Sequence, residues 1–434
     1  MSDMNDLYSE SLLLYGKTKY SSVLDDMIFA ARGDDTEGRK NAALRALKRI
    51  LSLAGSTGFY GNLWHDLLSL VIVSSENSYT LSAELKGKPS GSIERCALSD
   101  MAKFREWFLI DLSELGETLG VPELSVLEKY ESDASAGREY SPQVREKICS
   151  LAKDLAKCGD ASSMLSVADV FYREYGVGDL GLHKAFRLKT SGEQAEISPI
   201  SGIADVKFDD LVGYETAKQL LRDNTEAFLR GAPANNCLLY GDAGTGKSSS
   251  IKALANAYYG QGLRIIEIYR HEFRYIHGII DKLKRRNYRF ILYMDDLSFE
   301  DYETEYKYLK AVIEGGLEKK PENVLIYATS NRRHLVRESF NDKARLEDDD
   351  VHRSDTVQEK LSLYDRFGVT IRFGSPTPDE YKQIVRVLAQ REGIDVPDDE
   401  LMLMANRWQL KHAGYSGRTA RQLIDDILGR ESGG

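Results

Sequence analysis

Residues 238–248 read Leu238-Leu239-Tyr240-Gly241-Asp242-Ala243-Gly244-Thr245-Gly246-Lys247-Ser248. The segment fits the pattern G-x-x-x-x-G-K-[ST], in which a glycine-rich loop joins a buried strand to a helix. The apolar residues before Gly241 predict the strand, and the run from Ser248 to Ala255 predicts the helix. This stretch therefore predicts a phosphate-binding loop (P-loop) in an α/β fold.

The residue types of the loop suit ATP and Mg²⁺. Glycines let the backbone curl so that successive N–H groups point at phosphate oxygens, and the helix N-terminus adds a partial positive charge. Lys247 is expected to reach the β- and γ-phosphates, and the Ser248 hydroxyl is expected to bind Mg²⁺. The predicted nucleotide-binding residues of the loop are Gly241, Asp242, Ala243, Gly244, Thr245, Gly246, Lys247, Ser248 and Ser249.

Two acidic residues follow a second apolar run, Phe290–Met294. A buried strand would deliver Asp295 to the edge of the sheet where open α/β folds bind ligands, so Asp295 is predicted to hold Mg²⁺. Asp296 is predicted to orient or deprotonate the attacking water. Glu300 is the alternative for that catalytic role.

Three further polar residues are candidates for catalysis. The apolar run Leu325–Ala328 is followed by polar residues, the last of which is Asn331. We expect Asn331 to sense the γ-phosphate and position water, although asparagine is also well suited to cap the segment that follows. Arg366 precedes the last apolar run, and Arg418 begins the last predicted helix. Each arginine could stabilise phosphate charge or form a surface ion pair.

The surrounding pattern predicts a parallel sheet. Continuous apolar runs separated by helices are typical of such sheets. The predicted strands are 237–240, 263–269, 290–294, 324–328 and 369–373, and three lid helices are predicted over 378–391, 398–409 and 417–428. Residues 1 to about 190 are predicted to be mainly helical, with 77–85 as a short strand or loop and 190–202 as a polar linker.

Length and composition set the remaining expectations. A chain of 434 residues predicts more than one domain. We expect a mainly helical region over 1–200, a P-loop core over 201–375 and a helical lid over 376–434. A net charge of -10 argues against a generally basic nucleic-acid binder. No apolar run is long enough for a membrane span. The four cysteines form no C-x-x-C pair, so a reducing, cytoplasmic location is expected.

In this order the motifs resemble those of the AAA+ ATPases. The matching parts are the entry segment Phe208–Gly213, the P-loop, Asp295-Asp296, Asn331, the Asp365-Arg366-Phe367 box and Gly417-Arg418. The resemblance implies that Val212 and Gly213 contact the nucleotide. It also implies that Arg366 acts as a finger in a neighbouring subunit of a homo-oligomer and that Arg418 acts as a second sensor. Many AAA+ proteins carry Glu where this chain has Asp296.

A closer resemblance, over about 205–430, is to the family called domain of unknown function 815. The segments Asn224–Phe228, Asp295–Glu300 and Ala328–His334 carry it. The leading hypothesis is an AAA+ ATPase that uses ATP hydrolysis to remodel or load a macromolecular partner. The alternative is a nucleotide-switched nucleic-acid-binding module resembling helicase loaders, for which the basic cluster Lys282, Lys284, Arg285, Arg286 and Arg289 is the support. A P-loop kinase is a third hypothesis.

Overall fold

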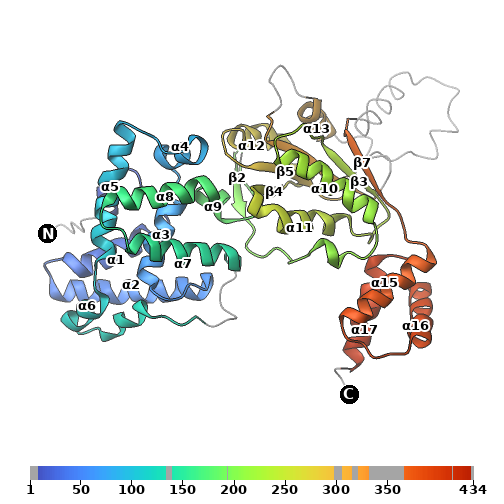
Figure 1. Ribbon diagram of the computed structural model, residues 1–434, viewed down its shortest axis with the longest axis horizontal. Helices are drawn as coiled ribbons and strands as arrows, with labels where there is room; N and C mark the ends of the chain where they lie inside the picture. Colours follow the sequence, from blue (N-terminus) through green and yellow to red (C-terminus); the bar gives the residue numbers. More distant parts are fainter. Residues whose placement is uncertain are drawn as a thin grey trace. The chain divides into compact units, whose positions relative to one another are not determined.

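The computed structural model describes residues 8–132, 139–192, 194–297, 305–314, 321–331, 366–412 and 414–431. The chain divides into two compact units (Figure 1). The first comprises Met1–His183 with Pro199–Gly202, and the second comprises Lys184–Ser198 with Ile203–Gly434. The domain boundary that we predicted near residue 200 stays a prediction.

The first unit is helical. Helix α3 (Leu63–Ser74) is apolar on all sides, and ten of its residues from Leu63 to Val73 are buried, so it forms the centre of this unit. The other elements are η1 (Tyr8–Ser11), α1 (Ser21–Arg32), α2 (Thr36–Thr57), α4 (Ser78–Lys86), α5 (Ser92–Phe108), α6 (Leu112–Leu119), η2 (Pro122–Glu128), α7 (Pro142–Ala156), α8 (Ala161–Tyr175) and α9 (Gly178–Leu182).

The expected strand or loop over 77–85 is wrong, because this segment is helix α4. Asn77 accepts hydrogen bonds from the backbone N–H groups of Tyr79 and Thr80, and the Thr80 hydroxyl accepts one from the Asn77 N–H. This capping box satisfies N–H groups that a helix start leaves open. The local cap therefore outweighs the weak alternation of polar and apolar residues.

One carboxyl is buried inside the first unit. Asp66 of α3 is 2% exposed, and the Cys149 thiol of α7 lies 3.7 Å from its Oδ2. Burial raises the pKa of Asp66 to about 7, and the nearby Cys149 and Lys153 only partly offset this effect. A buried carboxyl beside a weak donor such as a thiol is more stable in its neutral form.

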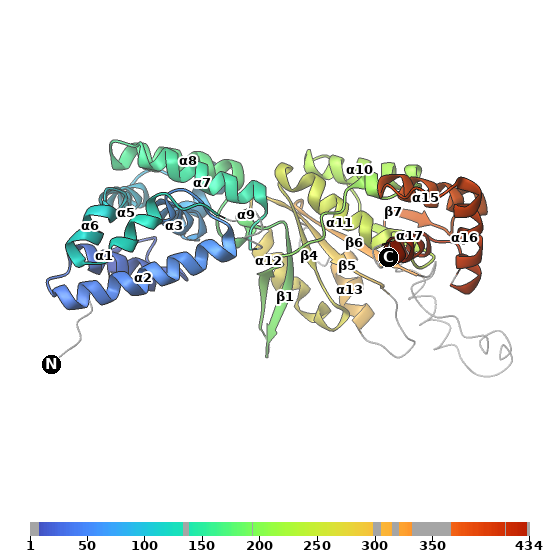
Figure 2. The ribbon, with the colours of Figure 1, turned by 90° about the horizontal axis from the view of Figure 1, so that it is seen from below.

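The second unit contains a seven-stranded sheet in the order β2-β1-β4-β5-β6-β3-β7. Strands β1 and β4 to β6 follow one another across the sheet in Figure 2. The five predicted strands are confirmed as β3 (Cys237–Gly241), β4 (Leu263–Glu267), β5 (Arg289–Met294), β6 (Val324–Ser330) and β7 (Val369–Phe373). Every pairing among these five is parallel.

Two strands of this sheet lie where we expected the end of a helical region and a linker. They are β1 (Ala185–Ser191) and β2 (Gln194–Pro199). β1 pairs in parallel with β4, with Ala185 opposite Ile265 and Arg187 opposite Glu267. Four of the seven residues of β1 and two of the six residues of β2 are polar and exposed, so neither strand shows the continuous apolar run by which the other strands were predicted.

The sheet order places the candidate site residues. The P-loop strand β3 lies between β6, which ends at Ser330, and β7. The carboxyl ends of parallel strands meet at one edge, and Asp295 and Asn331 leave the sheet there beside the P-loop. The remaining elements of this unit are η3 (Phe208–Asp210), α10 (Glu215–Leu229), α11 (Lys247–Tyr258), η4 (Tyr259–Gln261), η5 (Arg270–Tyr275), α12 (Ile276–Leu283) and α13 (Glu305–Glu314).

The three predicted lid helices are confirmed as α15 (Pro378–Arg391), α16 (Asp398–Lys411) and α17 (Gly417–Glu431). They pack around a small apolar core of their own that includes Tyr381, Leu401 and Ile424. The lid follows β7 and forms a separate bundle at one end of the sheet (Figure 1). The predicted architecture is confirmed: an α/β unit whose mostly parallel sheet carries a P-loop and is followed by a helical lid, preceded by a mainly helical region.

Candidate nucleotide-binding site

The P-loop curls between β3 and α11 on three glycines with positive φ. The φ angles are 135° at Gly241, 76° at Gly244 and 93° at Gly246. A Cβ on Gly241 would lie 2.0 Å from the carbonyl oxygen of Phe373, so the neighbouring strand leaves room for glycine alone. This backbone, together with the N-terminus of α11, forms a concave set of N–H donors of the kind that binds phosphate.

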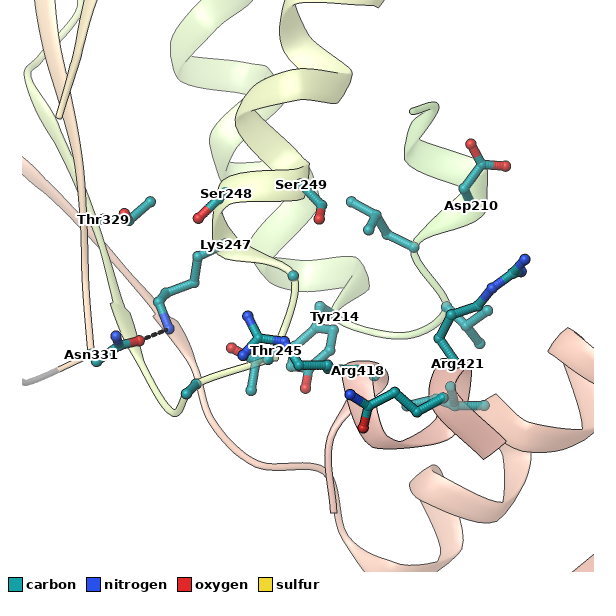
Figure 3. A pocket seen from close by; sticks show the side chains of 18 of the residues that line it. Asp210, Tyr214, Thr245, Lys247, Ser248, Ser249, Thr329, Asn331, Arg418 and Arg421 are labelled. Carbon is teal, nitrogen blue, oxygen red and sulfur yellow. Dashed lines mark hydrogen bonds between the residues drawn. The ribbon is translucent and has the colours of Figure 1, made fainter. Parts of the chain in front are cut away.

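Lys247 crosses the loop and is 6% exposed. Its ammonium donates to the carbonyl oxygens of Gly241 at 2.9 Å and Asp242 at 2.6 Å, and to Asn331 Oδ1 at 3.0 Å (Figure 3). Burial lowers the pKa of Lys247, and the nearby Asp242, Asp296 and Asp295 oppose that effect. The ammonium is therefore held by two loop carbonyls and the Asn331 amide oxygen.

One carboxylate oxygen of Asp295 accepts hydrogen bonds from four donors. Its Oδ1 accepts from the hydroxyls of Thr329 at 2.5 Å, Tyr293 at 2.7 Å and Ser248 at 2.8 Å, and from the Asp296 N–H at 3.2 Å. Burial acts to raise the pKa of this carboxyl, but these hydrogen bonds outweigh burial and lower it. Asp295 is thus held as an oriented carboxylate next to Ser248.

Asp296 and Asn331 face each other across the ends of β5 and β6. Asn331 Nδ2 donates to Asp296 Oδ1 at 2.8 Å, while its own Oδ1 accepts from Lys247. Each amide atom therefore has the one kind of partner that it can bind. Asp296 has a φ of 48°, and its N–H donates to Thr329 Oγ1 at 3.0 Å, which holds the backbone in this uncommon conformation.

These residues lie in a cavity of about 850 Å³, a volume typical of small-molecule sites. The lid closes part of this cavity. The side chains of Arg418 and Arg421 project from α17 (Figure 3), and the backbone N–H of Arg418 donates to the Gly244 carbonyl at 3.1 Å. The lining residues are Asp210, Leu211, Val212, Tyr214, Ala243, Gly244, Thr245, Gly246, Lys247, Ser248, Ser249, Asp295, Asp296, Thr329, Asn331, Ile384, Leu388, Gly417, Arg418, Arg421, Gln422 and Asp425.

Most of the predicted site residues therefore come together. Gly241, Asp242 and Gly213 are not part of the lining. Asp242 and Gly213 each adjoin a lining residue in the chain, and the Gly241 carbonyl accepts a hydrogen bond from the lining residue Lys247. Asp242 instead turns toward the lid, where its carboxylate accepts from the Ser375 N–H at 2.7 Å and hydroxyl at 2.9 Å. Glu300 lies outside the described residues.

Arg366 is not in the cavity. It lies three residues before β7, whereas the P-loop follows the paired strand β3, with Cys237 opposite Val369 and Gly241 opposite Phe373. Because the two strands are parallel, Arg366 and the P-loop are at opposite ends of the pair.

Sequence reasoning gave no role to several site residues. Tyr293 and Thr329 bind the Asp295 carboxylate, and Tyr214 and Arg421 line the cavity. A signal for Tyr293 was available, since it stands two residues before Asp295 and so shares its face of the strand. The contacts that involve Thr329 and the lid join distant parts of the chain, so no local sequence pattern predicts them.

The residues present fit Mg²⁺. This ion prefers oxygen ligands, keeps several waters and takes other ligands from phosphates, so the site needs few protein oxygens. Ser248 Oγ and the Asp295 carboxylate supply them, 2.8 Å apart. Over the described ranges, no three His, Cys, Asp or Glu side chains form a separate metal cluster.

The basic cluster on α12 and β5 is largely engaged within the chain. Lys282 donates to the Ala195 carbonyl at 3.0 Å, Lys284 pairs with Asp281 at 2.6 Å, and Arg289 donates to the Glu322 carbonyl at 2.6 Å. Within the part of the chain that the structure describes, no helix is long and apolar enough to cross a membrane.

A family model described as "Protein of unknown function (DUF815)" matches residues 181–431. The chain belongs to the DUF815 family. The DUF815 match extends over all seven strands, the P-loop and the lid, so β1 and β2 are included in it.

This DUF815 chain also has partial likenesses to two other proteins. A segment of 69 residues is 41% identical to the Replication factor C large subunit of Staphylothermus marinus, covering 16% of each chain. Among solved structures, the RuvB Holliday junction branch migration motor of Thermotoga maritima is 17% identical, with a TM-score of 0.36 over 52% of this chain and 64% of that one. The chain thus covers less than two thirds of either protein.

Proposed function

We propose that this chain binds ATP and hydrolyses it, and that hydrolysis drives the remodelling or loading of a macromolecular partner. The observation that carries the proposal is the hydrogen-bonded series Lys247–Asn331–Asp296, which lies beside Ser248 and Asp295 in one cavity. The residues that we propose for the phosphates, for a divalent cation and for the attacking water lie there within hydrogen-bond reach of one another.

The P-loop and Lys247 would hold the triphosphate. The backbone N–H groups from Gly244 to Ser248 would donate to its oxygens, and the Lys247 ammonium would move from loop carbonyls to the β- and γ-phosphates. Ser248 and Asp295 would hold Mg²⁺, which when bound neutralises phosphate charge. The Ser248 hydroxyl can keep donating to Asp295 while its lone pair faces the ion.

Asp296 would orient the attacking water or accept a proton from it. Its carboxylate is held by Asn331, which also contacts Lys247, so the amide links the base to the group nearest the γ-phosphate. A general base that is positioned for proton transfer contributes typically about 10²–10⁴-fold in rate. Arg418 would add positive charge from the lid, and Arg366 would act from a neighbouring subunit.

The helical first unit would recognise the partner, because the site residues account only for the nucleotide. A nucleic-acid-binding role has weaker support, since Lys282, Lys284 and Arg289 have partners within the chain. ATPase assays with and without single-stranded DNA test that alternative, since it requires turnover or affinity to respond to DNA. Pull-down with ATP-loaded Asp296→Asn tests for a protein partner.

The first prediction tests the P-loop. Lys247→Ala should lose ATP binding, because it removes the charge nearest the β- and γ-phosphates. Lys252→Ala is the matched control: it lies on the same helix but is exposed, and should bind ATP normally. Titration of a fluorescent ATP analogue measures both variants. If Lys247→Ala binds as tightly as the unaltered chain, the proposed nucleotide site is wrong.

A further inference from the structure

A polar cluster at the amino end of β3 has no role in the nucleotide cavity. It consists of Asn224 and Thr225 of α10, Asn235 and Asn236 ahead of β3, and Tyr327 of β6. Asn224 and Thr225 belong to the segment 224–228 that carries the family resemblance. The cluster lies at the same end of the sheet as Arg366.

Asn224 pins the backbone of Asn235 with both atoms of its amide. Its Nδ2 donates to the Asn235 carbonyl at 2.9 Å, and its Oδ1 accepts from the Asn235 N–H at 3.1 Å. The same Nδ2 donates to the hydroxyl of the buried Tyr327 at 2.8 Å, and that hydroxyl also contacts Thr225 Oγ1 at 2.9 Å. Asn235 therefore has a fixed position relative to β6 and α10.

Asn236 ties the same segment to the two flanking strands. Its side-chain Oδ1 accepts from the Ile326 N–H of β6 at 3.0 Å, and its carbonyl accepts from the Val369 N–H of β7 at 3.1 Å. Asn236 itself is buried. The start of β7 is thus anchored to the segment that Asn224 holds.

The Asn235 side chain fills the space beside Gly368. A Cβ on Gly368 would lie 2.6 Å from Asn235 Cγ and 2.8 Å from Asn235 Cβ. Rotation of the side chain could move Cγ, but Cβ follows the backbone that Asn224 pins. Phe367 is buried, so Arg366 lies in a short segment, 366–368, that is fixed by Phe367 on one side and by Asn235 on the other.

We propose that Asn235, held by Asn224, is a positioning residue for Arg366. It packs against Gly368 and thereby sets the place from which the Arg366 guanidinium reaches a nucleotide in a neighbouring subunit. This inference rests on the proposed role of Arg366. Misplacing a catalytic group by about 1 Å can cost about 100-fold in rate, so a displaced segment should impair the finger while leaving the chain's own nucleotide cavity unchanged.

The experiment uses Gly368→Ala in the full chain. Alone, this variant should bind ATP with unchanged affinity and hydrolyse it about 100-fold more slowly. It is then mixed with Lys247→Ala subunits, which cannot bind ATP but offer an intact Arg366, and separately with Arg366→Ala subunits, which bind ATP but offer no finger. Activity should return in the first mixture and stay low in the second.

The two mixtures separate positioning from general damage. A variant that is merely less stable would not be rescued by Lys247→Ala subunits, and normal hydrolysis by Gly368→Ala alone would overturn the proposal. Return of activity in the mixture with Arg366→Ala would also overturn it, because Gly368→Ala would then still supply a working finger.

A compensating change tests the contact itself. Asn235→Gly alone leaves the space beside Gly368 empty and should slow hydrolysis, because the packing that positions the segment is lost. Combined with Gly368→Ala, it removes the Cβ and Cγ that the new methyl group would meet. The methyl group then fills the same space, so the double variant should regain most of the lost activity. A folded double variant as slow as Gly368→Ala overturns the steric basis of the proposal. If Arg366→Ala itself hydrolyses ATP normally, both the finger and this inference fail, while Lys247→Ala still decides the nucleotide site independently.

Discussion

Asp296 is the residue on which the proposed chemistry depends most. Asp296→Asn should bind ATP, since Asp295 and the P-loop are unchanged, but should hydrolyse it about 10²–10⁴-fold more slowly because the base is lost. Asparagine tolerates the positive φ found at this position, so the fold should persist. Single-turnover hydrolysis measures the effect.

Glu300→Gln is the control for that prediction. It should retain turnover close to that of the unaltered chain if Asp296 is the base. Normal turnover in Asp296→Asn together with loss in Glu300→Gln would transfer the catalytic role to Glu300.

Asp66 gives the first unit a pH-dependent stability. Its pKa is raised to about 7 in the folded chain from an ordinary value of 3.8, so the folded chain holds the proton more tightly than the unfolded one. Stability should therefore fall as pH rises from about 4 to above 7, by roughly 4 kcal/mol at 1.36 kcal/mol per pKa unit. Denaturant unfolding at several pH values, followed by Trp64 and Trp107 fluorescence in a Trp408→Phe background, measures it.

Asp66→Asn serves as the comparison in that experiment. An amide cannot ionise, so this variant should lose most of the slope and exceed the parent in stability at pH 8. Equal slopes for the two chains would mean that another group is responsible.

At this scale, the sequence predicted the residues whose chemistry follows a local pattern. The P-loop, Asp295, Asp296 and Asn331 were found because each follows an apolar strand, and the structure brings them into one cavity. The donors on Asp295 were not found, because Thr329 comes from a different strand, and the partners of Asp242 lie 133 positions away in the chain.

The lid is the element whose attachment can be tested. Two residues of the P-loop hold the lid by hydrogen bonds. The Asp242 carboxylate binds Ser375 in the connection from β7 to α15, and the Gly244 carbonyl binds the backbone N–H of Arg418 at the start of α17. The Ser375 N–H and hydroxyl lower the pKa of Asp242, so this contact is between donors and a charged acceptor.

Asp242→Ala should therefore loosen the lid. Since Ile384, Leu388 and Arg418 of the lid line the cavity, ATP affinity should fall by roughly five-fold, the effect of about 1 kcal/mol for a largely exposed contact. Equilibrium binding of a fluorescent nucleotide measures it. Thr377→Ala removes the N-cap of α15 but leaves Asp242 and Ser375 intact, and should keep ATP affinity. Equal losses in both variants would argue against a specific role for Asp242.

Among the elements, those with long apolar runs were predictable and those governed by local caps or sheet edges were not. Strands β3, β4, β5 and β6 are almost entirely buried, so their apolar composition identified them, whereas β7 at the edge of the sheet is only partly buried. β2 lies at the edge of the sheet with β1 next to it, and the two strands carry polar residues such as Arg187 and Glu196. β1 takes its place in the sheet by pairing with β4, and β2 lies next to β1, which the residues of 185–199 do not reveal by themselves.

At the scale of the whole molecule, Arg366 predicts an assembly. Arg366→Ala should bind ATP nearly normally and lose hydrolysis, since fingers supplied by another subunit are worth about 10³–10⁵ in rate. Mixing it with Lys247→Ala should restore activity, because one subunit supplies the nucleotide site and the other supplies the arginine. Turnover of the mixture is compared with each variant alone; full activity of a chain that is monomeric at all concentrations would contradict the prediction.

The pairing of β1 with β4 also bears on where the half of the chain that contains the P-loop can be separated from the rest. A fragment cut at the expected linker, beginning near residue 203, would lack both strands and leave Ile265, Ile266 and Glu267 without their backbone partners. An open, apolar strand edge of this kind is a template for pairing between molecules, and hence for aggregation. A fragment beginning near residue 181, where the family match also begins, would keep that edge covered. The smallest stable piece of this half is therefore set by a strand that contributes nothing to the nucleotide cavity.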